Sequence, residues 1–254
     1  MRSIVLAVFA VAILTMIPLS HASYSVTNLN VTVALNKNTS AQVTEILTMI
    51  ISNSSVQQYT TNRVALNLTL SNWQNIIGPL LVQHIINPYK GVYNFKFLPG
   101  SVTNINGQNY AYLLMSYEVS NVTVVNQTAP RNFVYRFNPA VFNFEHGASG
   151  QVLNPNTTLT IVLPSGSQIK SVYPIPDYPP SAFTNDYANT TRVSWLYGEP
   201  LSKFTLTFVI TEGIQAEVVG FFGQIYKELG IFTYLIIAII ILAFILYAYF
   251  RVGR

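Results

Sequence analysis

The stretch LNVTVAL (29–35) alternates apolar and polar side chains along its whole length. Successive side chains of an extended chain point to opposite faces, so one face of this stretch is apolar and the other is polar. Strands of this kind bury one face against a core and leave the other in water, as strands of antiparallel sheets do. The residues turned toward the core are then Leu29, Val31, Val33 and Leu35.

The same alternation recurs along the chain and predicts a mainly β fold, an antiparallel β-sandwich. It is found in VALNLTL (64–70), LTIVL (159–163) and FTLTFVI (204–210), with Gly, Pro and Asn between the strands. Length allows one large sandwich or two small ones, with a possible subdivision near 126–132. The side chains predicted to be buried are Val31, Val33, Leu66, Leu68, Leu159, Ile161, Leu206 and Phe208.

One helix is expected among the strands, in SNWQNIIGPLLVQHII (71–86), where apolar residues follow a helical period. Ser71 or Asn72 would cap its start, and Pro88 follows its end. Gly78-Pro79 should kink or split it. A short helix of this kind either packs on the end of a sandwich or binds a partner.

The loop YPIPDYPPS (173–181) holds four prolines in nine residues, which force a stiff, extended path. It is interpreted as a rigid connection between strands. The alternative is a contact surface, because tyrosine provides large contact area at low entropic cost.

The two ends of the chain predict export and a membrane anchor. Residues 1–22 read as a secretory signal, with an apolar run that ends in Ser-His-Ala. The uncharged segment 231–250 is long enough to cross a bilayer, and the basic tail 251–254 follows it. A β-rich ectodomain (23–212) and a helical stalk (213–230) would lie outside the cell, as in a type I, single-pass membrane protein.

Charge excludes a nucleic-acid partner. The region 23–230 holds ten basic and nine acidic residues, and no Lys/Arg cluster is present to hold phosphates. Charged residues form only 9% of the chain, against roughly 25% in an ordinary globular protein. Either a glycan coat or an acidic medium would explain so few charges.

Glycosylation signals agree with an extracellular location for 23–212, and eight Asn-x-Ser/Thr acceptors occur there. The candidate sites are Asn30, Asn38, Asn53, Asn67, Asn121, Asn126, Asn156 and Asn189. The chain contains no cysteine, so a core must supply the stability that disulfides often give secreted domains. With its sequons, low charge and many tyrosines, the chain resembles in composition and layout the type I surface glycoproteins of thermoacidophilic archaea.

Catalytic, cofactor and metal sites are not expected. His84 falls on the predicted packing helix and is interpreted as structural. Glu145 and His146 are adjacent, but neighbours on a strand point to opposite faces and do not form a dyad. No Gly-x-Ser-x-Gly elbow, phosphate-binding glycine loop or cluster of metal ligands occurs. The protein is therefore expected not to be an enzyme.

Three functions remain open at this point. The favoured one is a membrane-anchored glycoprotein that links an envelope layer or an extracellular protein partner to the membrane. The second is an accessory single-pass subunit of a translocation, glycosylation or respiratory complex. The third is an exported hydrolase that uses two carboxylates. Such an enzyme needs only two acidic residues, and the chain contains several scattered Glu residues.

Overall fold

The structure is a computed structural model that describes residues 24–65, 69–129, 131–148, 150–179 and 190–213, with separate positions between 223 and 242. The chain divides into two compact units. The first comprises Met1–Val125 and Tyr135–Phe208, and the second comprises Asn126–Val134 and Val209–Arg254. The segments on both sides of Asn126–Val134 belong to the larger unit, and a boundary near 126–132 between two sandwiches stays a prediction.

Strands dominate the described residues. They are β1 (Tyr24–Leu35), β2 (Ala41–Ile51), β3 (Tyr93–Pro99), β4 (Thr103–Ile105), β5 (Gln108–Val119), β6 (Thr123–Ala129), β7 (Asn132–Phe137), β8 (His146–Gly147), β9 (Gly150–Gln151), β10 (Thr157–Val162), β11 (Ser167–Tyr173), β12 (Arg192–Trp195) and β13 (Thr205–Thr211). The helices are α2 (Val56–Val64) and α3 (Leu70–Ile77), with 3-10 turns at η1 (Asn53–Ser55) and η2 (Pro139–Val141).

A seven-stranded sheet organises the larger unit, in the order β12-β10-β1-β2-β5-β3, with β4 also paired to β5. Every second side chain is buried along all of β2, from Leu29 onward in β1 and from Ala111 onward in β5. The predicted strand at 29–35 is therefore confirmed. Of the eight side chains predicted to be buried, six are at most 1% exposed, while Leu66 and Leu68 lie outside the described residues. The six are Val31, Val33, Leu159, Ile161, Leu206 and Phe208.

The expectation of purely antiparallel sheets is wrong at the centre of this sheet. β1 pairs in parallel with β10, with Val31 opposite Leu159 and Val33 opposite Ile161. Both strands still bury apolar side chains on one face, so their alternating pattern resembles that of an antiparallel strand. Other pairs in this sheet, such as β1–β2 and β2–β5, are antiparallel.

A second, four-stranded sheet has the order β11-β13-β7-β6. Aromatic rings fill the core beside it. Tyr135 of β7 stacks on Phe208 of β13, with ring centroids 5.0 Å apart. Phe204 packs edge-on against Trp195 of the larger sheet, also at 5.0 Å, and against Phe137 at 5.3 Å. Several sheets around a shared aromatic core are consistent with the expected β-sandwich.

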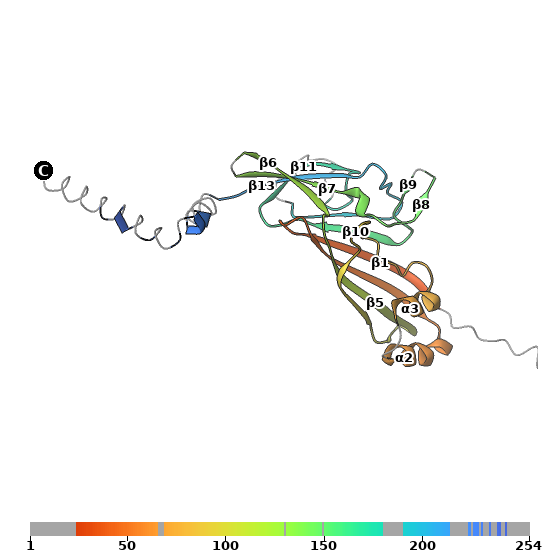
Figure 1. Cartoon of the computed structure of the whole chain (residues 1–254). Coiled ribbons are helices and arrows are strands. Elements are labelled where there is room, and N and C mark those ends of the chain that lie inside the picture. Colours follow the sequence, from red (N-terminus) through yellow and green to blue (C-terminus); the bar gives the residue numbers. More distant parts are fainter. Residues whose placement is uncertain are drawn as a thin grey trace, which may run out of the picture. The chain divides into compact units, whose positions relative to one another are not determined.

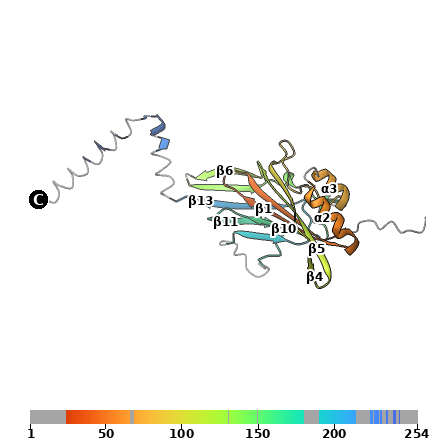
Figure 2. The same ribbon diagram turned by 90° about the horizontal axis from the view of Figure 1, so that it is seen from below.

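The helices α2 and α3 lie together at one end of the long strands β1 and β5, in both views (Figures 1 and 2). The buried ring of Trp73 packs against the rings of Tyr59 of α2 and Phe97 of β3, with ring centroids 5.4 and 6.1 Å apart. The Tyr59 hydroxyl donates to the Gly100 carbonyl oxygen (2.9 Å), which ties α2 to the sheet. A packing helix near Trp73 was expected, and α3 is such a helix.

The bounds of that helix differ from the expectation. Thr69, not Ser71 or Asn72, is the N-cap, and its side chain forms a reciprocal capping box with Asn72. The helix ends at Ile77 because Gly78 adopts a φ of 113°, which no helical residue has. Residues 78–87 therefore leave the helix, and His84 lies in an irregular segment.

The predicted strand VALNLTL (64–70) is also wrong. Val64 is the last residue of α2 and is 64% exposed, and Leu70 is the first residue of α3. Residues 66–68 lie outside the described ranges. Short apolar runs cannot be assigned by periodicity alone, and here the capping box at Thr69 takes precedence over the alternation.

The smaller unit contains most of β6, the start of β7 and the end of β13. Within it, Thr211 Oγ1 donates to Asn132 Oδ1 (2.9 Å), and the Glu212 backbone N–H donates to the Arg131 carbonyl oxygen (2.9 Å). These bonds attach the end of β13 and Glu212 to the start of β7 and to Arg131.

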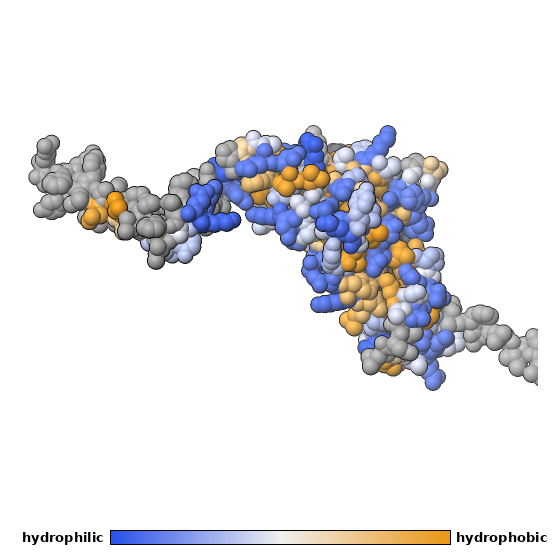
Figure 3. Space-filling model, in the orientation of Figure 1, coloured by the Kyte–Doolittle hydropathy of each residue, from blue (hydrophilic) through white to orange (hydrophobic). Residues whose placement is uncertain are grey.

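The outward face of the larger sheet is partly apolar. Ile46 of β2, Leu114 of β5 and Leu98 of β3 are in register across three strands. Leu98 is 56% exposed, and the other two are half-buried. Apolar surface is visible over part of the region of β3 and β5 (Figure 3).

Candidate functional site

The proline-rich loop after β11 is held against the edge strand β12. The indole Nε1 of Trp195 donates to the Pro174 carbonyl oxygen (2.9 Å). Tyr178 and Ser194 exchange backbone hydrogen bonds of 3.2 and 2.9 Å, and the Leu196 N–H donates to Asp177 Oδ2 (2.8 Å). The loop therefore covers the edge of the sheet, whose backbone groups would otherwise be unpaired.

This loop and the residues after β12, two segments joined by the Tyr178–Ser194 bridge, both expose large apolar side chains. We call the set the tyrosine platform: Tyr173, Ile175, Tyr178, Leu196 and Tyr197. Their exposed fractions run from 47% for Leu196 to 66% for Tyr197. Pro174 and Pro176 are buried beneath it. These hydrogen bonds fit the expected rigid connection over 173–179, whereas Pro180 and Ser181 lie outside the described residues. The exposed face of 173–179 has the composition of a contact surface.

The platform is nearly free of charge. Residues 173–179 and 194–198 include one charged residue, Asp177, and its Oδ2 already accepts a backbone hydrogen bond. Contacts here would come from aromatic and aliphatic area and from tyrosine hydroxyls. A partner held in this way should bind with little dependence on salt, because screening acts on charges.

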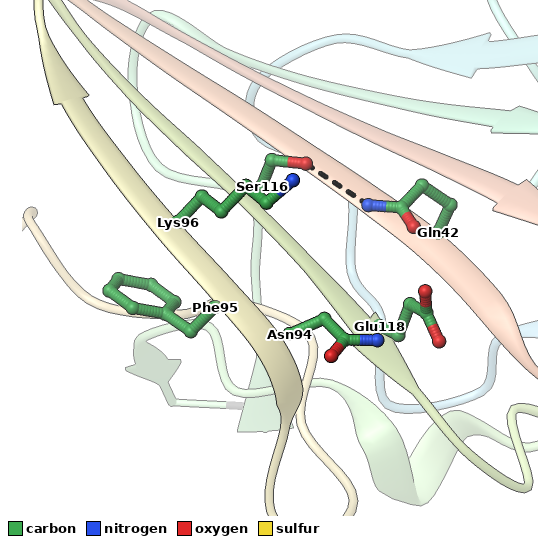
Figure 4. A pocket seen from close by; sticks show the side chains of 6 residues that line it. All are labelled: Gln42, Asn94, Phe95, Lys96, Ser116 and Glu118. Atoms are coloured by element: carbon green, nitrogen blue, oxygen red, sulfur yellow. Dashed lines mark hydrogen bonds between the residues drawn. The ribbon is translucent and has the colours of Figure 1, made fainter.

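A polar groove of about 300 Å³ lies on the outward face of β2, β5 and β3 (Figure 4). In it, Gln42 Nε2 donates to Ser116 Oγ (3.0 Å), and Asn94 and Glu118 lie next to each other. The register of β3 against β5 shifts between Tyr93 and Lys96 at this edge of the sheet. The two charged residues of the groove, Lys96 and Glu118, are both exposed to solvent, so no buried charge is present to bind a ligand there.

A cluster of hydrogen-bonded polar side chains is buried inside the larger unit. Glu45 of β2 and Tyr117 of β5 are fully buried, and His84 is 3% exposed. Glu45 Oε1 accepts from the His84 backbone N–H (2.8 Å) and from the Tyr117 hydroxyl, and Oε2 pairs with His84 Nδ1 (2.7 Å). Both oxygens of the carboxylate are thus occupied, as a buried charge requires.

Neighbouring elements hold His84 in this position. Its carbonyl oxygen accepts from the Asn143 N–H (2.8 Å), and its ring lies 5.0 Å from the ring of Phe144. The interpretation of His84 as structural fits these contacts, although the residue lies outside any helix. Through these contacts the cluster attaches segment 78–87 to β2 and β5.

The free energy of unfolding should fall as the pH rises from 10 toward 12. Burial raises the pKa of Tyr59 from 10.0 to about 12, and burial together with Glu45 raises the pKa of Tyr117 as well. In that range the unfolded chain binds fewer protons than the folded chain, so alkali favours unfolding. Below pH 10 both tyrosines are protonated and contribute fully to the stability of the folded state. This contribution is lost as the pH rises through their raised pKa values. Urea midpoints measured across this range check the slope, and a flat profile would contradict it.

The adjacent pair Glu145 and His146 does not form a site. Both are exposed, and they line different hollows: His146 lies beside Gln151 and Ser202, while Glu145 lies beside Leu80 and Asn156. This separation fits the expectation that strand neighbours face apart. Within the described ranges, no group of three or more potential ligands could hold a metal ion.

Six of the eight sequon asparagines lie in the described part of the chain. Five are exposed and one, Asn30 on β1, is half-buried. The exposed ones are Asn38, Asn53, Asn121, Asn126 and Asn156. Asn67 and Asn189 lie outside the described residues. The surface positions are compatible with attached glycans, and occupancy stays a prediction.

The predicted membrane and export segments fall almost entirely outside the described residues. The signal 1–22 and most of the stalk 213–230 are among them, and 231–250 is described at only four positions. In the described part, no helix has the length and apolar character needed to cross a bilayer.

The buried Glu45 cluster was not predicted from the sequence, although one signal of it is present there. In AQVTEILTMI (41–50) Glu45 occupies an inward position between Val43 and Leu47. A carboxylate in such a row needs buried donors. Its partners were not visible, because they depend on strand register and on an irregular segment.

Comparisons with known proteins add little. No family model matches the chain, and no curated protein matches it either. Among solved structures, it is similar to the folded domain of LppM from Mycobacterium tuberculosis, determined by NMR. The identity is 8%, the match covers 75% of this chain and 93% of that chain, and the TM-score is 0.26. A likeness at this level carries no statement about activity.

Proposed function

We propose that this protein is a membrane-anchored, N-glycosylated cell-surface protein that binds a protein partner in the envelope. Residues 1–22 direct export, the β region 23–212 lies outside the cell, and 231–250 hold it in the bilayer. The order of these segments in the sequence supports this topology.

The tyrosine platform is the observation that carries the binding role. Tyr173, Tyr178 and Tyr197 are about half exposed or more, and hydrogen bonds fix the backbone beneath them. Tyrosine is enriched where interfaces concentrate their binding energy, and a fixed loop loses little entropy on binding. The surface is thus preorganised for a large, mostly apolar contact.

A binding role without catalysis also agrees with where the acids and histidines lie. The acid–histidine contact that the fold forms, Glu45–His84, is buried and bonded internally. The acid–histidine neighbours on the surface, Glu145 and His146, face separate hollows. Neither arrangement is an acid–histidine dyad that opens to solvent.

Replacing Tyr178 and Tyr197 together with alanine should weaken partner binding by about 30-fold or more, because one interface hot spot is worth about 2 kcal/mol. The full chain is purified in mild detergent from its native membrane, and the proteins that accompany it are quantified by mass spectrometry. Recovery should persist in high salt for the unaltered protein, since the platform carries almost no charge.

The matched control is Tyr89→Ala, because Tyr89 is 95% exposed and lies outside the platform. It should leave recovery unchanged, and both variants should keep the melting temperature. Undiminished recovery with the double variant would refute the platform as the binding surface. Recovery with a lattice glycoprotein supports the envelope role, whereas recovery with polytopic membrane subunits supports an accessory subunit.

A further inference from the structure

A hollow of about 460 Å³ opens on the larger unit between the end of α3 and the turn before β10. Ile77, Pro79 and Leu80 form one wall, and Val26 of β1 contributes to the base. The other wall is the turn at 154–157, which includes Asn156. The hollow is therefore largely apolar, with a sequon asparagine on its rim.

The backbone fixes both walls. Gly78 ends α3 with its φ of 113°, and the Leu81 N–H bonds to the Gly78 carbonyl oxygen (3.3 Å), so the chain turns sharply. On the opposite side, the Leu29 N–H donates to the Asn156 carbonyl oxygen (2.9 Å). Asn156 is held at a φ of 61°, in the left-handed region that asparagine tolerates. The hollow is thus preformed, as small-molecule sites usually are.

We propose that this hollow seats the first sugars of an N-linked glycan on Asn156. Asn156-Thr157-Thr158 is an acceptor sequence, and the exposed Asn156 side chain lines the hollow itself. A sugar ring attached there is tethered at the site, so its local concentration is high without any affinity of its own. The occupant is carried by the chain, and no separate ligand is needed.

The chemistry of the walls suits a saccharide. Sugar rings present C–H faces that pack on aliphatic side chains such as Ile77 and Leu80. Their hydroxyl and amide groups need hydrogen-bond partners, and Glu145 and Asn154 supply polar groups in the lining of the hollow. Removing these half-exposed aliphatic surfaces from water stabilises the folded state in proportion to the area covered.

Another sequon provides a close match for comparison. Asn121 is also exposed and also has a positive φ, 56° against 61° for Asn156. It does not line this hollow. Replacing either asparagine with glutamine therefore introduces similar backbone strain and removes one glycan, and only Asn156→Gln uncovers the hollow.

The experiment uses the full chain in detergent, made once in a host that N-glycosylates and once in a host that does not. In glycosylated protein, Asn156→Gln should lower the melting temperature by about 2 to 4 °C more than Asn121→Gln, the shift that a loss of about 1 kcal/mol produces in a domain of this size. It should also speed amide hydrogen exchange in 76–81. In unglycosylated protein the two variants should differ by much less, because no sugar covers the hollow.

A second variant tests the contact directly. Leu80→Ser keeps the sequon but removes an aliphatic wall, so the difference in melting temperature between the glycosylated and unglycosylated forms should shrink. Equal effects of Asn156→Gln and Asn121→Gln in glycosylated protein would overturn the inference, as would an unaltered difference in Leu80→Ser.

This inference rests on the glycosylation proposed above and not on the partner. Peptide mass spectrometry distinguishes failure of the glycan seat at Asn156 from failure of the glycosylation proposal as a whole. An unmodified Asn156 with glycans on other sequons overturns the seat and leaves the glycoprotein proposal intact. Unmodified asparagines throughout overturn both. A glycan on Asn156 with slowed exchange in 76–81 supports the seat.

Discussion

Replacing Glu45 with alanine should lower the free energy of unfolding by about 3 to 5 kcal/mol, the usual effect of removing one member of a buried polar cluster. The substitution leaves the His84 N–H, the His84 ring and the Tyr117 hydroxyl without their acceptor. Burial excludes water as a substitute. Segment 78–87 then loses its main polar attachment to the sheet.

Urea denaturation followed by tryptophan fluorescence measures this loss, since Trp73 and Trp195 are both buried. Glu118→Ala is the control, because Glu118 lies on the outward face of β5 and is exposed. It should change the free energy of unfolding by no more than about 0.5 kcal/mol. A loss below about 1 kcal/mol for Glu45→Ala would show that the cluster contributes little.

A second variant, His84→Gln, shows how the three contacts of Glu45 share this loss. It removes the imidazole ring and keeps both the carboxylate and the backbone donor at position 84. Its loss in free energy of unfolding should be smaller than that of Glu45→Ala, since the Tyr117 hydroxyl and the backbone N–H still reach the carboxylate. Equal losses for the two variants would mean that the imidazole contact alone carries the effect.

Strand positions could be predicted from the sequence because burial of one face leaves a period of two. Val31 and Val33 are buried for this reason, and so are Leu206 and Phe208. The pattern does not identify the partner strand. The parallel pairing of β1 with β10 joins segments far apart in the sequence, and no local signal marks it.

Helix bounds were harder to predict, because caps decide them. Thr69 and Asn72 form the capping box that starts α3, and Gly78 ends it. These three residues override the apolar period that continues through Leu81.

The buried cluster was only partly predictable. Glu45 could have been flagged from its inward position alone, because its neighbours on that face of the strand are apolar. Its contact with Tyr117 depends on the register that places Val43 opposite Tyr117, which the sequence does not reveal.

The tyrosine platform falls between these cases. The prolines of 173–181 predicted a stiff loop, and hydrogen bonds hold its described part, 173–179, against β12 and Leu196. What could not be predicted is that Tyr178 pairs with Ser194, which joins the loop to the segment that carries the exposed Tyr197. The surface is formed by two segments joined through a β-bridge, and neither segment alone indicates it.

Truncating the chain after Gly213 should release a folded domain from the membrane, whereas the full chain should stay in the membrane fraction. The apolar segment 231–250 has the length of a bilayer span, and insertion of such a helix is effectively irreversible. The cut preserves β13, which ends at Thr211, and the bond from Glu212 to Arg131. Ultracentrifugation and the melting temperature of the released protein measure both parts. A truncated protein that still sediments with membranes would contradict the assignment of 231–250 as the anchor.

Exchanging 231–250 for an unrelated apolar helix of equal length then separates the two membrane roles. Apolar burial holds a span in lipid almost regardless of its sequence, whereas packing between spans depends on the side chains at their contact. An envelope protein that binds through its tyrosine platform should keep both its membrane association and its partner after the exchange. If the exchanged protein stays folded and in the membrane but loses its partner, the contact lies between spans. That result would replace the envelope role with the accessory-subunit role, and the double variant at Tyr178 and Tyr197 would then leave recovery unchanged.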